Sequence, residues 1–99
     1  MNVTKKQTGS ELLVELEGSI DSTTSNELNT SLNESLNGVN SMILDFKKID
    51  YVSSAGLRVL LATYKALVAK SGTMVIRNVN QNVMDIFTMT GFDNILTIE

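Results

Sequence analysis

The sequence predicts one α/β domain in which a mixed β-sheet of about four to five strands packs against helices. Apolar patterns typical of strands and of helices alternate along the 99 residues, in the order two strands, helix, strand, helix, strand, helix, strand. The later strand–helix–strand units require crossover connections, which favour parallel pairing. A chain this short rarely supports two hydrophobic cores, so we expect residues 1–99 to form a single domain.

The first two strands are predicted from alternation. In ELLVELEG, residues 11–18, one side of the segment is apolar and carries Leu12, Val14 and Leu16. The preceding NVTKK, residues 2–6, is expected to pair with this strand as a hairpin, because the intervening TGS segment is typical of a turn.

The segment after this hairpin has a helical period. Leucines recur every four residues, which places them on one helix face; they are Leu28, Leu32 and Leu36. We expect the helix to begin near Asp21 or Ser22, which are good N-cap types, and to end at Gly38. The next segment, SMILDF at residues 41–46, is short and continuously apolar, which predicts a strand covered on both faces.

The second half of the chain continues the alternation. An amphipathic helix is predicted from Ser54 to Lys70 by apolar residues at helical spacing, namely Leu57, Leu60, Leu61, Tyr64, Leu67 and Val68. TMVIRN, residues 73–78, is typical of another buried strand. A shorter helix around residues 83–87 closes at Gly91, and NILTIE at residues 94–99 is expected to form a short final strand.

The composition excludes several classes of function. Hydrophobic residues make up 42% of the chain and charged residues 19%, which suits a folded core and not a disordered chain. The net charge of −3 and the scattering of the 8 basic residues argue against a nucleic-acid partner. The chain has no Cys and no His, so disulfides, thiolate nucleophiles and Cys- or His-based metal sites are excluded.

Metal, cofactor and membrane partners are not expected either. Asp45 and Asp50 are isolated from other candidate ligands, so the sequence predicts no metal site. The N-terminal segment lacks the apolar core of a signal peptide, and no run of about 18 apolar residues occurs. We therefore expect a cytoplasmic protein that neither crosses nor binds a membrane.

The segment YVSSAGLRVLL contains the main candidate residues. Ser53 and Ser54 stand where a helix begins, and a serine there can act as an N-cap worth about 1 kcal/mol. The same backbone amides and helix dipole also suit a phosphate, so a kinase target is the alternative interpretation. Gly56 leaves the first turn without a side chain, which would let a large partner approach the serines. A catalytic serine is disfavoured, because no histidine is present to activate it.

Three segments resemble successive blocks of a bacterial STAS domain, the family of anti-sigma factor antagonists. They are GSIDSTTSNEL, MILDFKKIDYVSSAGLRVLL and MVIRNVNQNVMDIFTMTGFDNIL, which together with the intervening residues cover essentially the whole chain. The most specific part is LDF in a strand, then the hydrophobic IDYV, then SSAGL at the start of a helix; TGF before the last strand supports it. The resemblance implies a non-enzymatic regulator that needs no cofactor of its own.

What the resemblance implies in detail is a partner switch. The unphosphorylated antagonist binds an anti-sigma factor that is also a serine kinase, which frees the sigma factor. The kinase phosphorylates the antagonist on the serine that opens the second helix, and a metal-dependent serine phosphatase removes the phosphate. Aligned on SAGL, this serine is Ser54. Asp21, in GSID, matches an acidic position that lies close to the phosphorylation site in the family.

One position departs from the family pattern. Many members carry Asp immediately before the phosphorylated serine, where this chain has Ser53. Ser53 can still cap the helix, but the local negative charge is lower, which leaves the preference of the kinase open. Ser53 is also a second, weaker candidate for phosphorylation.

The second helix offers a candidate docking surface. Small residues and two cations form a stripe about a quarter-turn from the leucine face, namely Arg58, Ala62, Lys65 and Ala69. An ordinary solvated face is an equally good interpretation. Two other functions stay open: a STAS module that regulates a phosphatase, a signalling scaffold or a lipid-transport complex, and, far less favoured, a small hydrolase that uses Ser54.

Overall fold

A five-stranded sheet forms the centre of the domain. The structure is a computed structural model that describes residues 1–99. The strands follow the order β1-β2-β3-β4-β5 across the sheet. Their bounds are β1 Asn2–Thr8, β2 Glu11–Ile20, β3 Ser41–Val52, β4 Thr73–Arg77 and β5 Thr97–Ile98. β1 pairs antiparallel with β2 and every later pair is parallel, so the predicted mixed sheet is confirmed.

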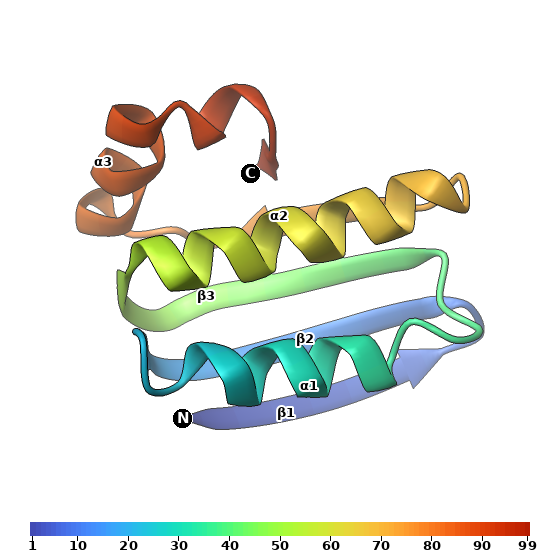
Figure 1. Ribbon diagram of the computed structural model, residues 1–99. Coiled ribbons are helices and arrows are strands. Elements are labelled where there is room, and N and C mark those ends of the chain that lie inside the picture. Colours follow the sequence, from blue (N-terminus) through green and yellow to red (C-terminus); the bar gives the residue numbers. More distant parts are fainter.

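Three helices connect these strands. Their bounds are α1 Ser25–Glu34, α2 Ser54–Ala69 and α3 Gln81–Thr90, and a single 3-10 turn, η1, follows at Phe92–Asn94. α1 and α2 run side by side along one face of the sheet, and α3 lies beyond α2 at one end of the domain (Figure 1). None of these helices is long and apolar enough to span a membrane.

The hydrophobic core lies between the helices and one face of the sheet. β2 and β3 bury alternate side chains there, because successive residues of a strand point to opposite faces. The strand residues are Leu12, Val14, Leu16, Met42, Leu44 and Phe46, and the helices add Leu28, Leu32, Leu57, Leu60 and Leu67. The rings of Phe46 and Phe87 lie 6.2 Å apart between centroids, which connects α3 to the same core.

The opposite face of the sheet lacks a helical layer. Leu13, Ile43 and Val75 stand side by side across β2, β3 and β4 on this face, and all three are only half-buried. The prediction that β3 and β4 are strands covered on both faces is therefore wrong. Their continuous apolar sequence comes from this short cross-strand row and not from a second layer of helices.

Two elements are shorter than the sequence predicts. α1 begins later than Asp21 or Ser22, because Asp21 closes a separate turn before the helix, and it ends before Gly38. The final strand does not fill residues 94–99, because η1 takes up the chain that precedes it and only β5 pairs with β4.

β3 is longer than predicted, because bulges let it continue past Phe46. Between the pairs Glu15↔Asp45 and Glu17↔Lys48, β3 contains one more residue than β2. Such a bulge removes the extra residue from the ladder without ending the strand. β3 then reaches Val52, which pairs with Ile20 at the end of β2. The two strands thus end together, and the loops that follow them form the candidate site.

Candidate functional site

The candidate site lies at the carboxyl ends of β2 and β3. Asp21 and Ser53 directly follow the paired residues Ile20 and Val52. The N–H of Ser53 donates to the carbonyl oxygen of Ile20 over 2.7 Å, which fixes the two loops side by side. α2 begins at the next residue, Ser54. The structure therefore brings the loops that carry Asp21, Ser53 and Ser54 side by side.

The two serines have different roles in this structure. Ser53 is the N-cap of α2, and its side-chain oxygen accepts a hydrogen bond of 3.2 Å from the N–H of Gly56. Its carbonyl oxygen also accepts from the N–H of Leu57 over 2.9 Å. The Ser54 side chain is exposed and forms no hydrogen bond within the chain. Ser53 is thus a structural cap, and Ser54 presents a free hydroxyl to solvent.

The start of α2 is favourable for an anion. Its first turn contains no acidic residue. By helix geometry, the N–H groups of Ser54 and Ala55 have no acceptor within the helix, and the helix dipole adds a partial positive charge at this end. A phosphoryl group on Ser54 would meet these donors directly. A serine nucleophile needs a general base that is hydrogen-bonded to its hydroxyl. The Ser54 hydroxyl has no such hydrogen bond.

Asp21 closes the turn that precedes α1. One of its carboxylate oxygens accepts hydrogen bonds from the N–H groups of Thr23 and Thr24, over 2.8 and 2.9 Å. The Thr24 hydroxyl donates in turn to the carbonyl oxygen of Ser19 over 2.7 Å. Asp21 was predicted as an N-cap of the helix itself. Instead it caps this turn, and Thr24 occupies the N-cap position of α1 without a side-chain cap bond.

The hydrogen bonds of Asp21 predict a turn that is sensitive to acid. The N–H of Thr24, followed by that of Thr23, holds the pKa of the Asp21 carboxyl below its usual value of 3.8. A carboxyl whose pKa is lowered by folding stabilises the fold above the unfolded-state pKa, and this contribution disappears as the pH falls through the folded-state pKa. We expect Asp21→Asn to be less stable than the parent at pH 7, with a difference that shrinks below about pH 4. Chemical denaturation at several pH values measures this, and a difference independent of pH would contradict it.

The missing side chain of Gly56 allows α2 to pack closely and does not give a partner access to the serines. A side chain at this position would point into the protein, where its Cβ would lie 2.6 Å from Cγ2 of Ile20 and 3.0 Å from Cγ1 of Val52. Residue 56 is itself buried, so it does not open the serines to a partner. The reason that the sequence suggested for this glycine is therefore wrong. Its absence of a side chain lets α2 approach the ends of β2 and β3.

The exposed stripe of α2 is present as predicted. Arg58, Ala62, Lys65 and Ala69 are all exposed, and no salt bridge or side-chain hydrogen bond holds either cation. Two of them, Arg58 and Ala62, also line a groove between α1 and α2. The α1 side of this groove is polar and consists of Ser25, Asn26 and Asn29, which the sequence did not single out. No local signal marks these residues, because the groove exists only through the packing of two helices.

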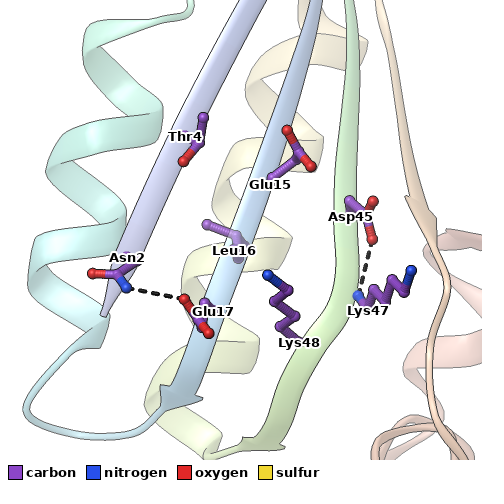
Figure 2. Close-up of a pocket in the computed structure, with 8 residues that line it drawn as sticks. All are labelled: Asn2, Thr4, Glu15, Leu16, Glu17, Asp45, Lys47 and Lys48. Atoms are coloured by element: carbon purple, nitrogen blue, oxygen red, sulfur yellow. Dashed lines mark hydrogen bonds between the residues drawn. The ribbon is translucent and has the colours of Figure 1, made fainter.

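A second hollow lies on the open face of the sheet, beside the bulge of β3 (Figure 2). Its charges are mixed, with carboxylates on β2 and β3 and the side chains of Lys47 and Lys48. The Asp45 carboxylate accepts from the N–H of Lys47 over 2.9 Å and from Asn78 over 3.1 Å. No group of three acidic, His or Cys side chains is arranged to hold a metal ion anywhere in the domain. The hollow lies at the bulge, because Asp45, Lys47 and Lys48, which line it, belong to the part of β3 where the register shifts.

Comparisons with known proteins identify the family. The sequence profile of the STAS domain matches residues 2–99. The chain belongs to the STAS domain family. It is 30% identical over 99 residues to BtrV of Bordetella bronchiseptica, named as a candidate anti-sigma factor antagonist, with 99% of this chain and 85% of BtrV covered. It is also 30% identical over 89 residues to the anti-sigma F factor antagonist of Paenibacillus polymyxa, with 88% of this chain and 76% of that protein covered.

Solved structures agree with the fold of this STAS domain. The crystal structure of a candidate anti-sigma factor antagonist from Thermotoga maritima superposes with a TM-score of 0.90. The two chains are 15% identical, and the superposition covers 97% of this chain and 84% of the other. The likeness at this low identity shows that the fold is shared.

Proposed function

We propose that this STAS domain is an anti-sigma factor antagonist whose binding is switched off by phosphorylation of Ser54. The observation that carries the proposal is the free, exposed hydroxyl of Ser54 at the start of α2, in a chain related along its whole length to named antagonists. The proposed partner is an anti-sigma factor that is also a serine kinase. A metal-dependent serine phosphatase would reverse the modification.

The other site residues have separate proposed roles around Ser54. Ser53 fixes the start of α2 and so sets the position of the Ser54 hydroxyl. Asp21 closes the neighbouring turn with its carboxylate and so holds that loop beside the start of α2. Gly56 holds α2 close to the strand ends. Arg58, Ala62 and Lys65 lie on the exposed side of the same helix and are the proposed partner contacts.

A single purified system tests this proposal. The full chain is mixed with each anti-sigma factor encoded in the same genome, and binding is measured by isothermal titration calorimetry. The complex that forms is then incubated with ATP and Mg²⁺, and the phosphorylated residue is mapped by mass spectrometry. We expect one anti-sigma factor to bind and to phosphorylate Ser54. If no anti-sigma factor binds, the protein serves another partner and the proposal fails.

Site mapping also decides between the two serines. Ser54→Ala should abolish phosphorylation, because Ser53 holds its side-chain oxygen in the cap hydrogen bond to Gly56. The matched variant Ser53→Ala should still be phosphorylated on Ser54. Phosphate on Ser53 of the Ser54→Ala protein would show that the cap bond does not protect this hydroxyl.

A further inference from the structure

The groove between α1 and α2 opens beside the candidate phosphorylation site, since Ala55, which lines it, directly follows Ser54. Its volume is about 270 Å³. The α1 side is lined by Ser25, Asn26 and Asn29, whose side chains are polar and uncharged, and the α2 side by Ala55, Val59 and Ala62 together with the cationic Arg58. The groove thus combines a small-residue floor, neutral polar groups and one cation.

Ser25 has a polar atom that the protein itself does not satisfy. Only 4% of this residue is exposed, and its hydroxyl takes part in no hydrogen bond of the chain. No fully buried side-chain oxygen or nitrogen lacks a partner in this domain, so the Ser25 oxygen must retain contact with solvent. The groove is the hollow that Ser25 lines. A group that enters the groove therefore meets a hydroxyl that can donate to it.

Arg58 supplies the charge for such a group. The domain contains two ion pairs, Lys6 with Glu15 and Arg77 with Glu99, and neither involves Arg58. Arg58 also forms no hydrogen bond within the chain and is exposed at the edge of the groove. An arginine in this state can hold a carboxylate through two parallel hydrogen bonds. The small side chains of Ala55 and Ala62 leave room for the backbone that carries the carboxylate.

We infer that the groove binds the carboxylate side chain of an Asp or Glu residue of the anti-sigma factor. This inference rests on the proposed function and names the chemistry of the contact. Arg58 binds the carboxylate, and the Ser25 hydroxyl, with an amide of Asn26 or Asn29, donates to its oxygens. Ser54 lies four residues before Arg58, hence one helical turn away on the same side of α2. A phosphate on Ser54 therefore competes for Arg58, so that modification both repels the partner and removes its anchor.

Charge reversal on both sides of the complex tests this inference. We expect Arg58→Glu to weaken binding of the anti-sigma factor roughly 100-fold, because it places two carboxylates together. Each exposed Asp and Glu of the anti-sigma factor is then replaced in turn by Arg. One of these variants should restore binding to the Arg58→Glu protein. The matched control is Lys47→Glu, which makes the same charge change on the opposite face of the sheet and should bind like the parent.

Ser25→Ala tests the polar side of the groove. It should weaken binding roughly fivefold to tenfold and leave the melting temperature unchanged, because the hydroxyl has no partner in the free protein. A lower melting temperature with unchanged binding would assign the hydroxyl to the fold instead.

If the parent binds and no acid-to-Arg variant rescues Arg58→Glu, the groove inference is wrong and the proposed function stands. Binding of a second copy of this chain in the groove, detected as a dimer that Arg58→Glu abolishes, would also overturn it.

Discussion

Phosphorylation of Ser54 should weaken the complex with the anti-sigma factor roughly 1000-fold, a change of about 4 kcal/mol. A phosphoserine adds about −1.5 to −2 charges, and an unpaired charge buried in an interface costs several kcal/mol. The exposed position of Ser54 at the start of α2 places this charge within the proposed interface. No rearrangement of the antagonist is needed for the loss of binding.

The same modification should leave the fold intact. The Ser54 hydroxyl takes part in no hydrogen bond, so its conversion to a phosphate breaks none. The N-terminal amides and dipole of α2 favour a negative charge there by about 0.3–1 kcal/mol. We therefore expect the melting temperature of the phosphorylated protein to equal or slightly exceed that of the unmodified protein. Differential scanning calorimetry of the two forms, beside titration calorimetry with the anti-sigma factor, measures both effects.

Variants of the two serines separate signalling from stability. Ser54→Ala should bind the anti-sigma factor in the presence of ATP as well as in its absence, with an unchanged melting temperature. Ser53→Ala should lower the free energy of unfolding by about 0.5–2 kcal/mol, because it removes the cap hydrogen bond to Gly56. Equal affinity of phosphorylated and unmodified protein would place Ser54 outside the interface. A melting temperature that falls on phosphorylation would instead indicate that the switch works by local unfolding.

The sequence locates the start of α2 well, because the signals there are local. A serine cap followed by an amphipathic period identifies the first turn of a helix without reference to the rest of the chain. Ser53 and Ser54 were therefore predicted at the correct positions. Which serine caps and which is free depends on the extended backbone of Ser53, and only the structure shows this.

Three other features were not predictable in this way. Asp21 has a side chain of the type that caps helices, yet its carboxylate closes a turn by accepting from the N–H groups of Thr23 and Thr24, and the Thr24 hydroxyl donates to the carbonyl oxygen of Ser19. The polar run at Lys47 and Lys48 resembles the end of a strand, yet a bulge carries β3 through it. The unpartnered hydroxyl of Ser25 is significant only because α2 packs beside it. The bulge and the Ser25 hydroxyl depend on neighbours that are distant in sequence, whereas the Asp21 turn depends on competing local hydrogen bonds within residues 19–24.

Gly56→Ala should destabilise the domain by about 1–3 kcal/mol, although alanine is the better helix former by about 1 kcal/mol. The added Cβ would lie 2.6 Å from Cγ2 of Ile20 and 3.1 Å from its carbonyl oxygen, so α2 or the end of β2 must move. That carbonyl oxygen also accepts the hydrogen bond from the N–H of Ser53. The displacement therefore reaches the loop that presents Ser54, and we expect slower phosphorylation as well as lower stability.

Two further variants show whether the clash is the cause. Ala55→Gly, at the neighbouring half-buried position, introduces no clash and should cost about 1 kcal/mol, because glycine has a lower helix propensity than alanine. In an Ile20→Ala background the methyl group nearest the new Cβ is gone, so Gly56→Ala should cost less there than in the parent. Urea denaturation of the parent, Gly56→Ala, Ile20→Ala and the double variant gives the coupling free energy between positions 20 and 56. If Gly56→Ala proves neutral or stabilising while binding of the anti-sigma factor is lost, residue 56 acts at the partner interface, and α2 does not need its close approach to the strand ends.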